Sequence, residues 1–296
     1  MNPRPKIIDC FAFFNELQLL ELRLKTLDSV VDQFVLVEAR ETFQGNSKAC
    51  FFEDNAARFA PYAHKITHLV IDRFTETSLS WDREAEQRNY MNATIAKCDP
   101  QDIILLSDVD ELPRPECLQA LRAHPPRANE IVCFSLQNFS YFLNLMNREP
   151  WQRLGPRAVL RQSFNGMENL RHIRGPANRR SRDILRFFRA CMRMRSLVSR
   201  RLVLDAGWHF SWLGGKEAAA TKVAAISVHK AMKRSGQALR DDRLKARRAA
   251  ISNHRDFKIV PIDDSFPADI RNNIEAWQSH ILTDDVLARE MGDGPE

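Results

Sequence analysis

The chain has 296 residues, of which 44% are apolar, so it can bury the full hydrophobic core of an ordinary globular protein. No apolar run reaches the roughly 20 residues that span a bilayer, and the first residues lack the pattern of a signal peptide. The six cysteines are scattered without a Cys-x-x-Cys pair, which favours reduced, packed thiols over a disulfide framework or a zinc site. We therefore expect a cytoplasmic protein.

Strand and helix patterns alternate through the first part of the chain. Apolar runs predict strands over residues 6–14, 34–37, 66–71 and 102–107. Leucines at helical spacing predict a helix after Asn15, where Gln18 three residues on is typical of a capping box. A second helix is expected from Ser80 or Asp82 to about Lys97. Alternating strands and helices predict βαβ units and a mostly parallel sheet.

The buried run over residues 102–107 leads directly into three carboxylates, Asp108, Asp110 and Glu111. Side chains alternate along an extended chain, so Asp108 and Asp110 project to the same side. Like charges this close repel each other unless a cation lies between them. The pattern therefore indicates a divalent metal carried in with a phosphate-rich substrate, although a solvated acidic loop would give the same spacing.

Polar residues follow three of the predicted strands: Asn15 with Glu16 after the first, Glu38 after the second and Asp108 after the fourth. The carboxyl ends of parallel strands lie at one edge of a sheet, which is where such sheets bind ligands. We expect these side chains to converge on one crevice, although each alone could be a cap or a turn residue.

Arg88 shares a helix face with Met91 and Ile95. A charge on an apolar face needs a partner, which would be either a substrate diphosphate or a carboxylate such as Glu38 or Asp110. The neighbouring Asn89 would satisfy backbone or ligand groups.

The second half is expected to contain strands over 131–136 and 139–145 and helices over 217–227, 240–251 and 267–282, before a tail at 283–296. Aromatic residues in and after the second of these strands would form either core or a wall for an acceptor sugar: Phe139, Tyr141, Phe142 and Trp151. His209 lies among three aromatic residues. It is a candidate to complete a metal shell with Asp108 and Asp110, to hold a phosphate, or to pack in the core.

Residues 171–201 contain eleven arginines and one acid, Asp183, with apolar residues interleaved. Three interpretations remain open: a basic amphipathic helix at an anionic membrane surface, a site for an acidic polymer, or a solvated insertion. Nucleic acid would be attracted by the charge, but no pattern indicates specific nucleic-acid binding.

Six segments in consistent order resemble glycosyltransferase family 17: residues 7–24, 31–45, 81–89, 102–115, 207–215 and 266–278. The resemblance implies a GT-A-like α/β fold with a mostly parallel central sheet. It places a single domain at 1–282, with a nucleotide-binding half at about 1–115 and an acceptor half at about 116–282. The basic stretch 171–201 has no counterpart that we can identify in the family.

The same resemblance implies an inverting, metal-dependent transfer from a UDP-sugar, with N-acetylglucosamine as the sugar. Asp108 and Asp110 would hold Mn²⁺ or Mg²⁺ with His209 nearby. The nucleotide would be held by Asn15, Glu38, Arg88, Asn89 and Asp108. The acceptor would be a saccharide or a lipid-linked saccharide.

Inversion also requires a base beside the acceptor hydroxyl, for which Glu111 and Asp205 are the candidates. Two rival functions remain open. A metal-dependent nucleotidyl or phosphoryl transferase would use the same carboxylates, and a non-enzymatic module would bind an anionic polymer or membrane through 171–201. Signatures of the common nucleotide-hydrolase, dehydrogenase, zinc-protease and esterase sites are missing from the sequence.

Overall fold

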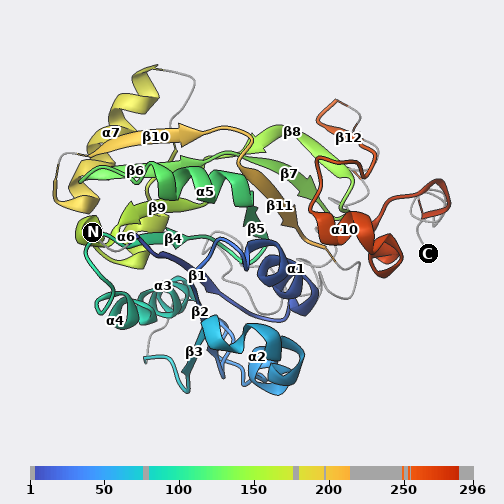
Figure 1. Cartoon of the computed structure of the whole chain (residues 1–296), viewed down its shortest axis with the longest axis horizontal. Helices are drawn as coiled ribbons and strands as arrows, with labels where there is room; N and C mark the ends of the chain where they lie inside the picture. The colour runs from blue at the N-terminus through green and yellow to red at the C-terminus, as the bar shows by residue number, and fades with distance from the viewer. Residues whose placement is uncertain are drawn as a thin grey trace.

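The computed structural model describes residues 4–75, 80–175, 180–196, 198–213, 249, 253 and 255–286. Its larger sheet has seven strands in the order β10-β6-β9-β4-β1-β2-β3 (Figure 1). The strands are β1 (Ile7–Ala12), β2 (Gln33–Ala39), β3 (Ile66–Ile71), β4 (Ile103–Leu106), β6 (Glu130–Phe134), β9 (Arg157–Leu160) and β10 (Ser199–Val203). Only β9 runs antiparallel to its neighbours in this sheet. The expected α/β fold with a mostly parallel central sheet is confirmed.

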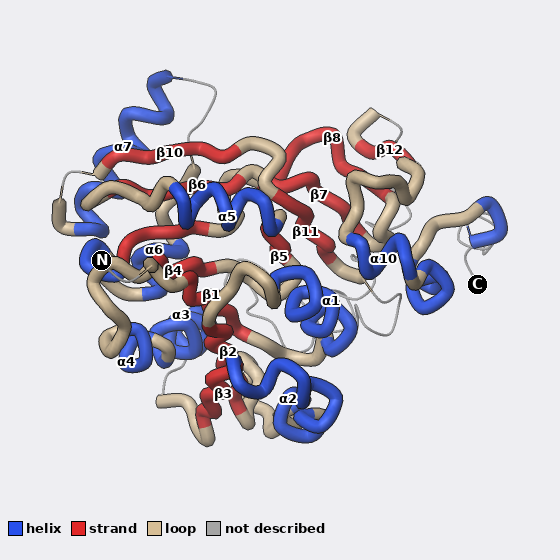
Figure 2. The backbone as a smooth tube through the Cα atoms, in the orientation of Figure 1, coloured by secondary structure: helices blue, strands red, loops and turns tan. Residues whose placement is uncertain are grey.

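A second sheet of five strands has the order β12-β8-β7-β11-β5 (Figure 2). Its strands are β5 (Glu111–Pro113), β7 (Leu136–Ser140), β8 (Leu145–Trp151), β11 (Gly207–Ser211) and β12 (Phe257–Ile259). β5 begins only a few residues after β4, and its antiparallel pairing with β11 sets His209 opposite Glu111. The second sheet therefore brings a distant segment of the chain to the acidic loop after β4.

Helices cover both faces of the larger sheet. Alternate side chains of β1 therefore pack into two different hydrophobic cores. Ile7 and Phe11 pack with leucines of α1 (Leu17–Leu27) and α5 (Pro115–Ala123), on the side turned to the viewer in Figure 1. Ile8 and Cys10 pack in the other core, with apolar residues of α4 (Asn92–Ile95), α6 (Met167–Arg171) and α7 (Arg180–Met194). Burying apolar side chains on both faces stabilises the strand ends on which the site is built.

The structure also describes the helical segments α2 (Phe51–Asp54), η1 (Ala56–Lys65), α3 (Ser80–Tyr90), η2 (Arg161–Ser163), α10 (Ala268–Asn272) and η3 (Ile274–His280). None of the helices in the described part of the chain is both long and apolar enough to cross a membrane.

Several expected boundaries are wrong. The helix expected up to about Lys97 divides between Tyr90 and Asn92, and that expected over 267–282 divides into α10 and η3. The strand expected over 139–145 is interrupted because Tyr141 has a φ of 67° and turns the chain from β7 into the antiparallel β8. No side chain caps α1, so the capping box is not formed. The helices expected over 217–227 and 240–251 lie outside the described residues, apart from Ala249, as does most of the tail.

The close approach of the β11 and β5 backbones at Gly207 can be tested by substitution. Its φ is 147°, and a Cβ atom there would lie 2.1 Å from the carbonyl oxygen of Leu112. We expect Gly207→Ala to lower the free energy of unfolding by about 2–4 kcal/mol, since backbone atoms would have to move. Thermal denaturation beside Ser199→Ala, an exposed change on β10, measures this, and equal stabilities would contradict the packing described.

Candidate functional site

A cavity of about 170 Å³ lies at the carboxyl ends of β1 and β4. We call it the acidic cleft. It is lined by residues from the β1 and β4 loops, from the loop after β2 and from α3: Ala12, Phe13, Phe14, Glu16, Phe43, Glu84, Gln87, Arg88, Asp108, Val109 and Asp110. Segments far apart in sequence therefore meet at one sheet edge, which is the position where α/β sheets bind ligands.

The two aspartates of the cleft have different surroundings. The Asp108 side chain is 45% exposed, whereas the Asp110 side chain is 10% exposed. An Asp110 Oδ1 atom lies 3.9 Å from His209 Nε2, and the Phe210 N–H donates to the Asp110 carbonyl at 2.9 Å. β11 thus fixes the buried aspartate and leaves the other at the cleft surface.

Arg171, from the last turn of α6, binds both ends of this loop. Its guanidinium contacts the Asp108 carboxylate at 2.5 Å and the Glu111 carboxylate at 3.0 Å. Burial lowers the pKa of Arg171, but Asp108 and Glu111 outweigh it and hold the pKa well above its usual range. Arg171 is thus a fixed cation of the site. In the sequence, Arg171 stands out only as the first arginine of the basic stretch.

Glu111, one of the two candidate bases, is fully buried. Its carboxylate accepts hydrogen bonds from Trp151 Nε1 at 2.6 Å, from Arg171, and from the Asp108 N–H at 2.9 Å. A carboxylate with its oxygens engaged in this way holds the loop in shape and is not open to an acceptor hydroxyl.

Arg23 is a second buried arginine that the sequence analysis did not single out. It lies on α1 with no exposed surface and pairs with the buried Asp9 of β1 at 2.6 Å. Its Nη1 also donates to the carbonyl of Glu111 at 2.8 Å, so it ties α1 to the acidic loop. Its place on the leucine face of α1 was an available signal, since a buried charge requires partners.

The other candidate base, Asp205, lies elsewhere. It sits in the turn between β10 and β11 with a φ of 46°, and its carboxylate accepts from Arg114 at 3.3 Å and Gln137 at 2.9 Å. It precedes the end of β11 that pairs with Pro113, and it does not line the acidic cleft. The structure does not bring Asp205 together with Asp108 and Asp110.

Glu38 lies within β2 instead of following it, because the strand continues to Ala39 in register with β3. The side chain is fully buried, accepts the backbone N–H of Phe52 at 3.0 Å, and lies 3.0 Å from His68 Nε2. Glu38 thus holds the start of α2 and does not line the acidic cleft. Asn15 likewise lines a different cavity, described below.

Arg88 lines the acidic cleft and forms ion pairs with Glu84 on its own helix and with Glu168 of α6, the latter at 2.8 Å. Its carboxylate partners are therefore neither Glu38 nor Asp110. Asn89 points to α6 as well, where its Oδ1 accepts the Glu168 N–H at 3.1 Å. Together they join α3 to α6, the helix that carries Arg171.

His209 is held beside Asp110 by two contacts. Its Nδ1 lies 3.0 Å from Asn138 Oδ1, and its ring stacks on Trp151 with a centroid separation of 4.4 Å. Carboxylate oxygens suit Mn²⁺ or Mg²⁺ as ligands, whereas an imidazole nitrogen suits a transition metal better than Mg²⁺. No three His, Cys, Asp or Glu side chains among the described residues are grouped to hold a metal by themselves.

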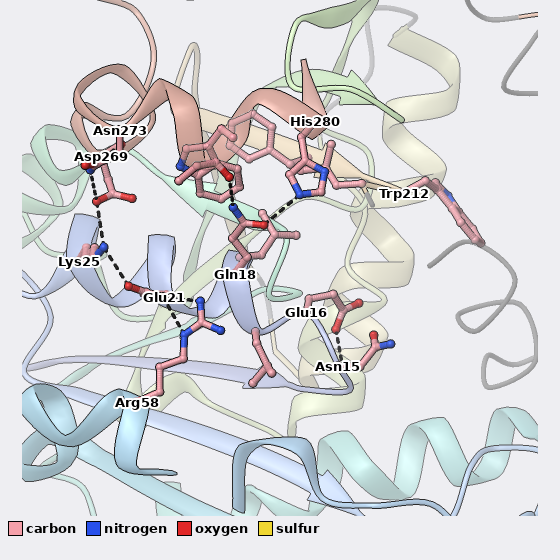
Figure 3. Close-up of a pocket in the computed structure, with 16 residues that line it drawn as sticks. Asn15, Glu16, Gln18, Glu21, Lys25, Arg58, Trp212, Asp269, Asn273 and His280 are labelled. Atoms are coloured by element: carbon pink, nitrogen blue, oxygen red, sulfur yellow. Dashed lines mark hydrogen bonds and ion pairs between the residues drawn. The ribbon is translucent and has the colours of Figure 1, made fainter. Parts of the chain in front are cut away.

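The aromatic residues expected to form an acceptor wall are used differently. Phe139 and Phe142 are buried in the core, and Trp151 packs on His209 and binds Glu111. Aromatic residues instead line a larger cavity of about 520 Å³, the α1 cavity (Figure 3). Its lining is Asn15, Glu16, Leu17, Gln18, Leu19, Glu21, Lys25, Arg58, Phe210, Trp212, Leu213, Asp269, Asn273, Ala276, Trp277 and His280.

The model of glycosyltransferase family 17 matches residues 1–176. No curated protein matches the sequence.

Among solved structures, a mannosyltransferase from Pyrobaculum calidifontis in complex with GDP-Man and Mn²⁺ aligns with a TM-score of 0.40 and 14% identity, covering 100% of this chain and 77% of that one. An inositol-1-phosphate CTP transferase from T. maritima aligns with a TM-score of 0.40 and 11% identity, covering 74% and 95%. A glucosyl-3-phosphoglycerate synthase from M. tuberculosis aligns with a TM-score of 0.36 and 11% identity, covering 90% and 92%.

The ion pair between Glu168 and Arg88 predicts how protein stability changes with pH. Burial raises the pKa of Glu168, but His172 and Arg88 outweigh it and lower the pKa to about 2. A carboxylate with a depressed pKa stabilises the fold above its unfolded pKa of about 4.3, and this stability is lost as pH falls toward 2. Relative to wild type, Glu168→Gln should cost about 1–3 kcal/mol at pH 7 and progressively less between about pH 4.5 and 2.

Urea denaturation across this pH range measures the difference, with Glu116→Gln on the exposed face of α5 as the control. A difference that stayed constant with pH would show that the ionised form of Glu168 is not what stabilises α6.

Proposed function

We propose, from the premise that this chain belongs to glycosyltransferase family 17, that it transfers a sugar from a UDP-sugar bound with a divalent cation in the acidic cleft. The family model covers more than half of the chain, and the protein is a glycosyltransferase. The donor, the metal and the stereochemical outcome are the parts of the proposal that go further.

The proposal rests on one observation: Asp108 and Asp110 line the same cleft, and the more buried Asp110 lies beside His209. Asp108 and Asp110 would hold Mn²⁺ or Mg²⁺, with His209 as a third ligand or a neighbour. When bound, the cation would neutralise charge on the leaving diphosphate. Arg88 in the cleft wall would contribute a further positive charge. All residues that line the cleft lie in the proposed nucleotide-binding half, residues 1–115.

The sugar is proposed to be N-acetylglucosamine, transferred with inversion to a saccharide or a lipid-linked saccharide. Both details come from the family resemblance. Inversion requires attack from the face opposite the diphosphate, and therefore a separate acceptor site that opens to the same reacting carbon.

The donor proposal predicts the behaviour of two variants. Asp108→Asn and Asp110→Asn should each lower UDP release from UDP-N-acetylglucosamine about 10²-fold or more, since each removes a charge from the proposed cation site. Chelation by EDTA should abolish UDP release in wild type, and added Mn²⁺ should restore it.

Asp264→Asn is the control, because that side chain is 99% exposed and is not among the residues that line the cleft. A screen of UDP-sugars read by UDP release identifies the donor. Wild-type activity in both aspartate variants would reject the cation site, and release of UMP or pyrophosphate instead of UDP would point to nucleotidyl transfer.

The basic stretch supports a further proposal, a peripheral contact with anionic membrane. On α7 the side chains of Ile184, Leu185, Phe188 and Met192 are each more than half exposed. Beside them, a cavity of about 390 Å³ is lined by five arginines: Arg153, Arg174, Arg186, Arg189 and Arg193. Within the described part of the chain, no ion pair joins these arginines to a carboxylate, and burial and the neighbouring guanidinium groups lower the pKa of Arg174. Exposed apolar groups beside excess positive charge suit an anionic lipid surface.

Membrane contact predicts binding to vesicles that contain phosphatidylglycerol and weak binding to phosphatidylcholine vesicles. Phe188→Ser should lower partitioning about 10-fold, which corresponds to the apolar burial lost from one large side chain. Cosedimentation at low and high salt measures both effects. Equal binding to neutral and anionic vesicles would reject the contact.

A further inference from the structure

The α1 cavity lies between α1, the end of β11 and the segment formed by α10 and η3 (Figure 3). It joins residues near the start of the chain to residues near its end. Gln18 of α1 makes this connection directly, because its Nε2 donates to the Ala276 carbonyl at 3.0 Å and its Oε1 lies 2.9 Å from His280 Nε2. The C-terminal segment therefore completes a cavity that α1 begins.

The lining combines aromatic surface with amide and carboxylate groups. Trp277 is almost wholly buried in the wall, and Trp212 lies at one margin of the cavity (Figure 3). Gln18 and Asn273 present amide groups that both donate and accept hydrogen bonds. A sugar ring has an apolar C–H face that packs on aromatic rings and hydroxyl groups that pair with amides and carboxylates.

The charges in this cavity are balanced by ion pairs. Lys25 lies 2.9 Å from Glu21 and 3.0 Å from Asp269, and Arg58 lies 2.5 Å from Glu21. Burial lowers the pKa of His280, so this imidazole is neutral at pH 7. Every lysine and arginine that lines the cavity is thus paired with a carboxylate, in contrast to the arginine-lined cavity beside α7. This lining favours an uncharged ligand over a phosphorylated one.

Glu16 belongs to both cavities. It lines the α1 cavity together with Asn15, and it lines the acidic cleft together with Asp108 and Asp110. Its side chain is only partly buried, and its carboxylate accepts the Asn15 N–H at 3.2 Å. Among the carboxylates of this region, Glu16 is the one that both cavities share.

We propose that the α1 cavity is the acceptor site for an uncharged saccharide and that Glu16 is the general base of the transfer; this inference rests on the proposed function. The acceptor hydroxyl gives its proton to the Glu16 carboxylate as its oxygen bonds to the anomeric carbon of the donor sugar. The bond between that carbon and the β-phosphate oxygen breaks, and its electron pair leaves with UDP. Glu16 then returns the proton to solvent.

This assignment replaces the two candidate bases taken from the sequence. Glu111 is enclosed by Arg171 and Trp151, and Asp205 is paired with Arg114 away from the cleft. A base has to lie between the donor carbon and the acceptor hydroxyl, and the shared wall of the two cavities satisfies that condition.

The base is tested by Glu16→Gln, which keeps the size of the side chain and removes its proton affinity. UDP release from UDP-N-acetylglucosamine and Mn²⁺, with water as the acceptor, should fall about 10²–10⁴-fold. The affinity for UDP and Mn²⁺, measured by titration calorimetry, should stay within about twofold of wild type. Glu116→Gln on α5 is the matched control and should hydrolyse the donor at the wild-type rate.

Two outcomes of this experiment are decisive. A Glu16→Gln protein that hydrolyses the donor like wild type overturns the base assignment while leaving the donor proposal intact. Lack of UDP release by wild type from any UDP-sugar rejects the donor proposal, and the acceptor site is then decided by binding alone.

The acceptor site is tested by saturation-transfer NMR and tryptophan fluorescence with N,N′-diacetylchitobiose, methyl β-glucoside and methyl α-mannoside. At least one of these neutral probes should bind, and Trp212→Ala should weaken that binding about 10-fold or more without changing UDP affinity. Glucose 6-phosphate should bind more weakly than the neutral probes. Tighter binding of the phosphorylated sugar, failure of all three neutral probes to bind, or binding unaffected by Trp212→Ala would overturn the assignment.

Discussion

The acidic loop after β4 depends on two buried arginines that come from different helices. Arg23 of α1 pairs with Asp9 and donates to the Glu111 carbonyl, and Arg171 of α6 binds the carboxylates of Asp108 and Glu111. Ions buried in this way are costly to separate, because a lone buried charge loses its hydration without a partner. The loop is therefore held in one conformation, which is the condition for presenting carboxylates to a cation at a fixed geometry.

This network also divides the acids of the loop by role. Glu111 faces inward, with its oxygens engaged by Trp151 and Arg171, and it keeps the loop in shape. Asp108 remains half-exposed at the cleft, and Asp110 lies between the two environments beside His209. Three carboxylates within four residues thus have different surroundings, because burial and hydrogen bonding differ at each of them.

The two cavities meet at the loop between β1 and α1, where Glu16 lines both. The acidic cleft is built entirely from the first 110 residues, whereas the α1 cavity needs Phe210 to Leu213 and the segment after Pro267. If the acidic cleft binds the donor and the α1 cavity binds the acceptor, most substitutions in one lining would leave the other lining unchanged. The matched segment of the family model, residues 1–176, contains the whole of the first cavity and part of the second.

The sequence by itself determined the strand–helix alternation, the mostly parallel sheet and the position of Asp108 and Asp110 at a strand end, because these follow from local periodicity. For His209 it left three roles open, of which a place beside the Asp108 and Asp110 pair was one. It did not determine the partners of the buried charges. Glu38, Asp205 and Arg88 were candidates for binding a ligand, and each has a partner from a distant part of the chain that the sequence analysis did not name. Arg171 and Glu16 acquired their places from contacts between segments distant in sequence, so only the tertiary structure decided which charged groups are engaged and which line a cavity.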